Sequence, residues 1–349
     1  MRRIRVCIYG GTDLRGTPTE FISALAYEVL DRMGAVIVTG GFDHSVDKPH
    51  ATSTDRAALD GARRYSEEHT TDLKECYEAW VPEPTLDSRP DVGGVVRMTE
   101  ALGITVSRVM GKTPLGRRLA MVRGVDLVVT ISGKRHTEVV GEQALELGIP
   151  FLPIPNADGD SQNLLKPYRA QIAARFAPGA LDECLQRVDE TIDQKPGLAA
   201  QAVVTLLQTA KVGRCLVLLP YDSEHETIYR STIEPAVSEQ MIPLRLDQLP
   251  KSDAIYTSFA NAVDDATALI VDITQLNENV MYEVGFAHGR GLSPLIYTRD
   301  PSRLENLPVY FRTLNVRLVM HPAQLAPLIG QYLGELKTAR GMPHKALSS

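Results

Sequence analysis

The feature that most constrains the fold is a regular alternation of short apolar runs with segments of helical periodicity. In the first half of the chain, strand-like runs at 4–11 (IRVCIYGG), 35–41 (AVIVTGG) and 126–131 (DLVVTI) are each followed by a stretch with helical spacing. This alternation is typical of a mainly parallel sheet covered by helices on both faces. The sequence therefore predicts an α/β protein.

The same alternation begins again at 214–220 (RCLVLLP), after a helix-favouring stretch without a strand pattern. A chain of 349 residues is long for one core and suits two, because domains commonly hold about 100–200 residues. We expect two doubly wound, mainly parallel-sheet domains of the Rossmann or flavodoxin type, joined by a helical connector. The expected bounds are 1–190 for the first domain, 191–212 for the connector and 213–349 for the second domain.

Composition narrows the choice of partners and location. The net charge of −6 argues against a nucleic-acid partner, which usually requires a basic face. No apolar run reaches the ~18–20 residues of a membrane helix, and the first residues lead directly into a strand pattern, so we expect a cytoplasmic protein without a membrane partner. The scattered cysteines and histidines show no metal-ligand spacing, which predicts reduced thiols and no metal site.

Three turns that follow strands in the first domain have residues suited to a phosphate-bearing ligand. Glycine allows backbone amides and helix N-termini to approach phosphate at the carboxyl ends of parallel strands. The alternative is that these glycines serve turn geometry alone. The candidate nucleotide-binding residues in these turns are Gly10, Gly11, Thr12, Gly40, Gly41, Gly133 and Thr137.

The helix motif Arg117-Arg118-Leu119-Ala120-Met121, followed by the loop from Ser132 to Thr137, resembles the SLOG superfamily. That superfamily groups the LOG phosphoribohydrolases with the DprA/Smf proteins, and the resemblance covers roughly Arg3–Pro155. It implies a Rossmann-like domain that binds a nucleotide. Arg117 and Arg118 are expected to bind the anionic group by bidentate hydrogen bonds. The alternative is that they form a solvated helix face together with Arg123.

The loop departs from the LOG pattern in ways that bear on chemistry. Lys134, Arg135 and His136 replace most of its glycines, and Val140 stands where the resemblance implies a catalytic glutamate. Glu138 or Glu142 would have to substitute for it, and we retain Glu142 as the candidate. Sensing of a nucleotide is therefore the favoured role for this domain.

The segment from Asp272 to His288 is the most informative in the second half of the chain. Asp272 and Thr274 end a buried strand pattern, and Asn277 or Asn279 can cap the helix that follows. Helical spacing places Asn279 and Glu283 on one face, so we expect Glu283 to point along the same crevice as Asp272. A glutamate in covered surroundings is seldom left without a function or a partner.

The alternative for Glu283 is an ion pair with Arg245 or Arg299. His288, late in the same helix, is read as a capping or packing residue.

Together with Tyr221-Asp222 and the run at 228–236, this segment resembles the nucleoside 2-deoxyribosyltransferases and the TIR domains. The resemblance covers roughly Arg214–Arg299 and implies cleavage of an N-glycosidic bond with one essential glutamate, Glu283. A carboxylate near the anomeric carbon stabilises or traps an oxocarbenium-like centre. The residues expected to assist are Asp272, which binds sugar hydroxyls or transfers a proton, Asn279, which orients Glu283, and Tyr221, Asp222, Thr274 and Asn277, which bind the substrate.

The leading hypothesis is a nucleotide-sensing bacterial effector whose second domain cleaves the N-glycosidic bond of NAD or a related nucleoside or nucleotide. The resemblance links such effectors to anti-phage defence and to homo-oligomers. We expect no resident cofactor, with NAD or a nucleotide serving as substrate or signal. One alternative is a non-catalytic nucleotide-binding adaptor. Two others keep catalysis: a LOG-like nucleoside-monophosphate phosphoribohydrolase acting through the first domain, and a nucleoside deoxyribosyltransferase without a signal.

Overall fold

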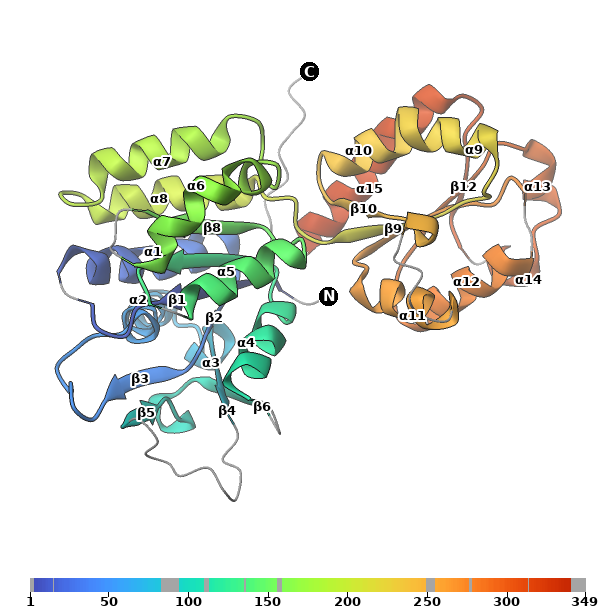
Figure 1. Ribbon diagram of the computed structural model, residues 1–349. Coiled ribbons are helices and arrows are strands. Elements are labelled where there is room, and N and C mark those ends of the chain that lie inside the picture. The colour runs from blue at the N-terminus through green and yellow to red at the C-terminus, as the bar shows by residue number, and fades with distance from the viewer. Residues whose placement is uncertain are drawn as a thin grey trace. The chain divides into compact units, whose positions relative to one another are not determined.

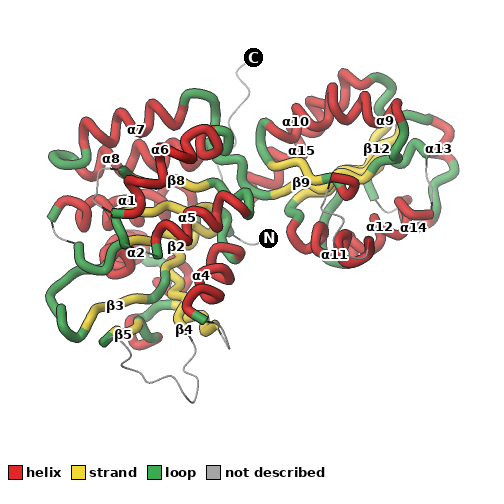
Figure 2. The backbone as a smooth tube through the Cα atoms, in the orientation of Figure 1, coloured by secondary structure: helices red, strands yellow, loops and turns green. Residues whose placement is uncertain are grey.

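The structure is a computed structural model that describes residues 3–14, 16–82, 94–109, 113–134, 136–155, 159–248, 255–275, 278–312 and 314–339. The chain divides between Ala210 and Lys211 into two compact units, which we call the first unit and the second unit. Each contains a parallel sheet between two layers of helices (Figures 1 and 2), as the sequence predicted. The expected fold class, two doubly wound α/β domains, is therefore confirmed.

The first unit is built on a six-stranded parallel sheet of order β6-β4-β2-β1-β7-β8. Its strands are β1 (Arg5–Gly10), β2 (Val36–Thr39), β4 (Tyr77–Pro82), β6 (Thr105–Val109), β7 (Leu127–Ile131) and β8 (Phe151–Ile154). A separate antiparallel pair consists of β3 (Phe42–Ser45) and β5 (Val95–Arg97). The strand order reverses between β1 and β7, and ligands of open α/β sheets bind outside the carboxyl ends of strands near such a point.

Helices cover both faces of this sheet (Figure 1). The contacts of α1 (Thr17–Met33) with α2 (Thr54–His69) and those of α4 (Pro114–Arg123) with α5 (Thr137–Glu146) group them into two layers, which right-handed crossovers place on opposite faces. The helix α6 (Asp160–Ala173) packs beside α5. Short α3 (Leu73–Cys76) leads into β4.

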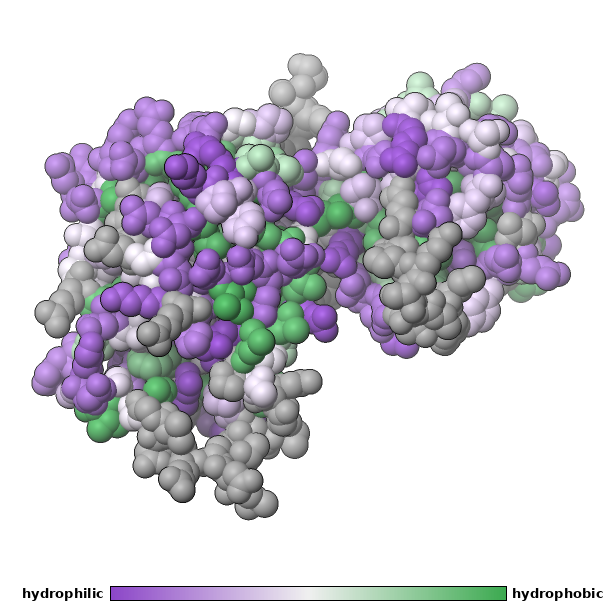
Figure 3. All heavy atoms as spheres, in the orientation of Figure 1, coloured by the Kyte–Doolittle hydropathy of each residue, from purple (hydrophilic) through white to green (hydrophobic). Residues whose placement is uncertain are grey.

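The stretch expected to act as a connector lies largely within the first unit. There α8 (Pro196–Gln208) packs against α1 and against α7 (Ala180–Thr191). Its buried face contains Ala200, Val203 and Leu207, and an apolar helix face of this kind requires a packing partner. Over α6 and α7, the surface shown in Figure 3 is mostly hydrophilic, as expected for the outer side of a helical layer.

The second unit contains a five-stranded parallel sheet of order β10-β9-β11-β12-β13. Its strands are β9 (Arg214–Leu218), β10 (Ile242–Leu244), β11 (Ala268–Asp272), β12 (Leu295–Thr298) and β13 (Val316–Leu318). Numbered along the chain, this is the flavodoxin-like order 2-1-3-4-5, whose topological switch point lies between the first and third strands. The carboxyl ends of β9 and β11 therefore mark the place to look for a site.

Two separate cores lie on the two faces of this sheet. One contains Ile270 of β11 with Ile228 and Ile329, from helices α9 (Ser223–Ile228) and α15 (Leu325–Ala339). The other contains Val271 and Val284, and it is covered by α11 (Ile255–Asp265), α12 (Glu278–Gly289) and α14 (Val309–Arg312). The π-helical turn Tyr229–Ile233 and α10 (Glu234–Ser238) continue α9, and α13 (Pro301–Glu305) follows β12. Within the described part of the chain, no helix is long and apolar enough to cross a membrane.

Candidate functional sites

Three arginines converge at the carboxyl ends of β1, β2 and β4 in the first unit. Arg117 is 4% exposed, and its Nη1 donates to the carbonyl oxygens of Gly40 at 3.1 Å and Trp80 at 2.9 Å. Arg118 is 8% exposed, and its Nε donates to the hydroxyl of Tyr9 at 3.0 Å. Burial lowers the pKa of Arg117, and the neighbouring Arg118 lowers it further. The fold thus holds these cations close together at a cost in solvation.

A carboxylate and a third arginine complete this group. Asp55, near the start of α2, is buried and accepts a hydrogen bond from the amide of Phe42 at 2.7 Å. Burial raises the pKa of Asp55 to about 6, against the opposing effects of the Phe42 amide, Arg97 and Arg117. Burial and the charge of Arg117 lower the pKa of Arg97, at the end of β5. We call Tyr9, Asp55, Arg97, Arg117 and Arg118 the arginine cluster.

The glycines of the first two turns allow close approach of backbone. A Cβ on Gly10 would lie 1.9 Å from the carbonyl oxygen of Ile131, so only glycine fits between β1 and β7. Gly41 has φ +69°, and Gly40 lies within the arginine cluster, where a Cβ would be 3.6 Å from Nη1 of Arg117. The carbonyl oxygen of Gly11 accepts from the amide and hydroxyl of Thr54. Thr12 is exposed.

The third turn, between β7 and α5, is closed by the chain itself. The amide of Asp160 donates to the carbonyl oxygen of Gly133 at 2.8 Å, and the Asp160 carboxylate accepts from the amide of Glu138 at 3.2 Å. Thr137 is buried against Gly133, where a Cβ would lie 1.9 Å from its Oγ1. An acidic side chain of the protein therefore already lies at the N-terminus of α5, where a phosphate would otherwise bind.

The structure does not present an acid for catalysis at the positions considered in the described part of the first unit. Glu142 accepts a hydrogen bond from the hydroxyl of Tyr168 at 2.9 Å. Val140, at the position where the family resemblance implies a glutamate, is fully buried. Lys134 and His136 are exposed, and Arg135 lies outside the described residues.

In the second unit, a polar network joins three loops at the carboxyl edge of the sheet. Asp222 follows β9 and caps α9 by accepting from the amide of His225 at 2.9 Å. Nδ1 of His225 lies 2.8 Å from both carboxylate oxygens of Asp222, and Nη2 of Arg299 lies 2.9 Å from its Nε2. Because a guanidinium only donates, Nε2 accepts and Nδ1 carries the hydrogen. Arg299 also pairs with Glu224. We call Asp222, Glu224, His225, Asp272 and Arg299 the edge network.

Asp272 is the fully buried member of the edge network. Its side chain is fully buried, with Oδ1 accepting from the amide of Thr274 at 2.8 Å. Oδ2 lies 3.6 Å from Nε2 of His225 and 3.7 Å from Nε of Arg299. Asp272 therefore points toward α9, whereas α12 covers the opposite face. The expectation that Asp272 and Glu283 share one crevice stays a prediction.

Glu283 has the environment of a functional acid. Burial raises the pKa of Glu283 to about 7. No residue in the described ranges forms an ion pair with it, and both suggested partners are engaged elsewhere, Arg299 with Glu224 and Arg245 with Asp247. Desolvation, and then the charge of Glu283, raises the pKa of Tyr221 to about 12, so the phenol lies within electrostatic reach of the carboxylate. The structure thus brings these two predicted residues together.

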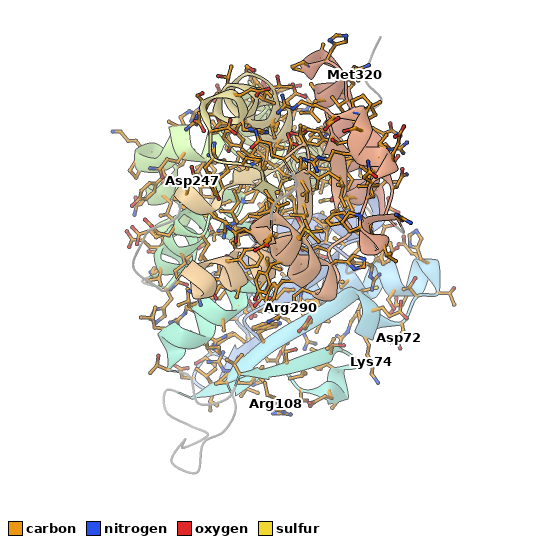
Figure 4. All side chains as sticks on the ribbon, turned by 90° about the vertical axis from the view of Figure 1, so that its right-hand side faces the viewer. Asp72, Lys74, Arg108, Asp247, Arg290 and Met320 are labelled. Atoms are coloured by element: carbon orange, nitrogen blue, oxygen red, sulfur yellow. The ribbon has the colours of Figure 1, made fainter. Side chains whose placement is uncertain are left out.

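A buried arginine supports Tyr221. Arg245, which follows β10, is 3% exposed and pairs with Glu226 and, at 2.6 Å, with Asp247, which Figure 4 labels. Its guanidinium lies 5.7 Å from the ring centroid of Tyr221 and 4.4 Å from that of Tyr229. Tyr221 is exposed, so its ring has one side available to a ligand and another held by a cation.

The remaining predicted residues lie near this edge in different roles. Oγ1 of Thr274 accepts from the amide of Arg299 at 2.9 Å, which joins the loops after β11 and β12. Nε2 of Gln275 lies 3.4 Å from Oδ2 of Asp222. Asn279 is exposed in the first turn of α12, and Asn277 lies outside the described residues. The Thr274 side chain therefore holds these two loops together.

Comparisons with known proteins give limited similarity. No protein-family model matches the sequence, and a search of curated proteins gives no match. Three solved structures are similar to this chain, each at 17% sequence identity. TM1055, a structural-genomics target, has a TM-score of 0.33 over 48% of this chain and 81% of its own, and the molybdenum cofactor binding protein of the phototrophic bacterium Rippkaea orientalis has a TM-score of 0.33 over 49% of this chain and 88% of its own. DNA processing protein A of Helicobacter pylori, which is described as having a unique single-stranded DNA binding mode, has a TM-score of 0.32 over 49% of this chain and 74% of its own. At these TM-scores they carry no conclusion about ligand or activity, and the expectation against nucleic acid stays a prediction.

Sequence reasoning missed several residues of these two sites. Tyr9, Asp55 and Arg97 come from segments far apart in the chain, and no local motif indicates that they meet Arg118. His225 lies three residues after Asp222, a spacing typical of helix capping that was available in the sequence. Arg245 was considered only as a partner of Glu283.

Proposed function

We propose that the second unit cleaves the N-glycosidic bond of NAD or of a related nucleoside or nucleotide, with Glu283 acting at the anomeric carbon. The observation that carries this proposal is the state of Glu283: burial raises its pKa to about 7, and it forms no ion pair within the described chain. Acids held in this way, next to a switch point of an open parallel sheet, are candidates for function.

The chemistry requires the ionised carboxylate. As the bond between the anomeric carbon and the base nitrogen breaks, the base leaves with the bonding electrons and positive charge develops on the sugar. Glu283 either stabilises that charge or forms a covalent ester with the anomeric carbon, and water then adds its oxygen there and releases a proton. Protonated Glu283 can do neither, so activity should increase as pH rises through about 7.

The surrounding residues have roles consistent with this reaction. Tyr221 offers an exposed ring for the leaving base, beside Glu283. The edge network fixes the loops after β9, β11 and β12, so Asp222 and Asp272 are assigned to positioning these loops. Asn279, exposed near the start of α12, stays a candidate for contact with substrate.

We further propose that the first unit binds the nucleotide signal through Arg117 and Arg118. Catalysis in the first unit, as a phosphoribohydrolase, is disfavoured because Glu142 is bonded to Tyr168 and Val140 is buried in place of a glutamate. A role in anti-phage defence and assembly into homo-oligomers belong to the same proposal and rest on the family resemblance alone.

The test is release of free base, followed by chromatography, from NAD, nucleosides and nucleoside monophosphates. Wild type is compared with Glu283→Gln and with a matched control, Glu278→Gln, which alters an exposed acid in the first turn of the same helix. Release by wild type and control but not by Glu283→Gln supports the proposal and identifies the substrate. Equal release by all three proteins contradicts the assignment of Glu283. Absence of release from every compound, with nucleotide still bound, would favour the adaptor.

A further inference from the structure

The arginine cluster holds more positive charge than the described residues around it balance. The carboxylate that acts on both Arg97 and Arg117 is Asp55, and burial shifts that acid toward its neutral form. Neither Arg97 nor Arg118 forms an ion pair with any residue in the described ranges. Among the described residues, three guanidinium groups therefore share one carboxylate, which is an excess of about two positive charges.

The hydrogen-bond donors in the cluster are only partly used. Nη1 of Arg117 is satisfied by two carbonyl oxygens, so this residue chiefly links the ends of β2 and β4. Arg118 is only 8% exposed and uses Nε toward Tyr9, and within the described structure its two Nη groups bond to no acceptor of the protein. These Nη groups are not among the fully buried, unpartnered atoms, so they are accessible to an anion that would accept their hydrogen bonds.

The other position expected to hold a phosphate is already filled. The Asp160 carboxylate accepts from the amide of Glu138 in the first turn of α5, and Asp160 and Ser161 donate to the carbonyl oxygens of Gly133 and Ser132. An anion arriving there would meet a carboxylate of the protein. The arginine cluster therefore has hydrogen-bond donors available for an anion, whereas the described part of the turn between β7 and α5 is occupied by the Asp160 carboxylate.

We propose that the first unit binds the terminal phosphate dianion of a nucleotide through Arg118 and Arg97 at the carboxyl ends of β1 and β2, and not at the turn between β7 and α5. This inference rests on the nucleotide binding proposed above and adds the charge and the place of the group that is bound. The guanidinium fork matches two phosphate oxygens. A cyclic phosphodiester, with a single negative charge, satisfies the cluster less well.

The ligand class is tested by calorimetric titration of the full-length protein with four probes: inorganic phosphate, AMP, adenosine and cyclic AMP. We expect AMP to bind, phosphate to bind more weakly at the same place and compete with AMP, and adenosine and cyclic AMP to bind at least about 10-fold more weakly than AMP. Competition by free phosphate distinguishes recognition of the phosphate from recognition of the nucleoside.

The place is tested by substitution. Arg118→Gln and Arg97→Gln should each weaken AMP binding by about 10-fold or more, because each removes charge-assisted hydrogen bonds. Arg123→Gln, an exposed arginine at the end of the same helix as Arg118, is the matched control and should bind as wild type does. Asp160→Ala, at the turn between β7 and α5, should change the affinity by less than about 2-fold.

The variant Asp55→Asn distinguishes an electrostatic role of the arginine cluster in binding from a structural role. Asp55→Asn keeps an acceptor for the amide of Phe42 but removes the negative charge, so AMP should bind about 3-fold to 10-fold more tightly. A purely structural role for the cluster would instead lower the affinity.

Three outcomes overturn the inference. If AMP binds and the Arg97 and Arg118 variants match the control, the phosphate lies elsewhere and nucleotide binding stands. If cyclic AMP binds as tightly as AMP, a dianion is not the group recognised. If neither AMP nor phosphate binds, both the inference and nucleotide binding by the first unit fail. Base release in the absence of added nucleotide is a separate measurement, which tests Glu283 and not the arginine cluster.

Discussion

At the scale of single residues, Glu283 and Asp55 show how a fold shifts an acid toward its neutral form. Burial raises the pKa of both, to about 7 and about 6 respectively, but their surroundings differ. Asp55 keeps a backbone amide and two arginines as partial compensation, whereas desolvation alone acts on Glu283. The uncompensated burial of Glu283 lowers the stability of the folded protein. It is useful for chemistry because the acid changes charge near neutral pH.

The cost of Glu283 predicts a pH-dependent stability difference. Its pKa is raised from 4.5 in the unfolded chain to about 7, so the penalty for burying its carboxylate is absent below about pH 4.5 and is complete once pH has risen through about 7. At about pH 8, Glu283→Gln should unfold at higher urea concentration than wild type, by about 1–2 kcal/mol in the free energy of unfolding, after allowance for partial exposure. At about pH 4.5 the two proteins should unfold alike, and a difference that does not vary with pH would contradict the burial argument.

At the scale of elements, the sequence predicts the long, regular members of the sheets and misses the short ones. Strands β10 and β13 have three residues each and lie at the edges of their sheet, where no period can be read from the sequence. The sequence analysis does not predict β4, because this strand contains a charged residue, Glu78, and ends in Pro82. In the structure, Glu78 forms an ion pair with Arg5 of β1. These features depend on partners distant in the chain.

The candidate site divides in the same way. The motif around Glu283 is local, so its helix and the turn at Tyr221 could be placed from the sequence, and the structure brings them together. The side of β11 to which Asp272 points follows from its register with Ile270 and Val271, which the local motif does not give. The arginine cluster needed tertiary structure, since Asp55 and Arg97 precede and follow a long stretch without a motif.

Packing between α1 and α2 gives a test at the scale of elements. A Cβ on Gly61 of α2 would lie 2.0 Å from the carbonyl oxygen of Ser23 of α1. Gly61→Ala should therefore push the helices apart and cost about 2–4 kcal/mol of unfolding free energy. Gly197→Ala, in the first turn of α8 with nothing within 4 Å, is the control and should be neutral or stabilising by up to about 1 kcal/mol. Equal thermal shifts for the two variants would contradict this description of the interface.

At the scale of the whole molecule, each unit has its own group of perturbed side chains at a carboxyl edge. The first gathers cations although the chain carries a net charge of −6, and the second carries an isolated acid. A basic site in one unit and an acidic site in the other suit binding of a nucleotide and attack on a sugar, respectively. The proposed effector joins these two activities in one chain.

Such an effector should respond to its nucleotide. With saturating AMP, base release by wild type is expected to increase at least about 5-fold, within the usual range of coupling between two sites. The increase should be absent in Arg118→Gln at the same AMP concentration and retained in the control Arg123→Gln. Equal rates with and without AMP in the wild type would show that the two units act independently.

The most direct test of the central claim is the pH profile of kcat/KM for base release, which reports the ionisation of groups in the free protein. We predict that kcat/KM rises by about 10-fold per pH unit below about pH 7 and levels off above it, in wild type and in Glu278→Gln alike. Glu283→Gln should release no base at any pH. A flat or falling profile, or base release by Glu283→Gln at the wild-type rate, would contradict the assignment of Glu283 as the carboxylate that acts on the sugar.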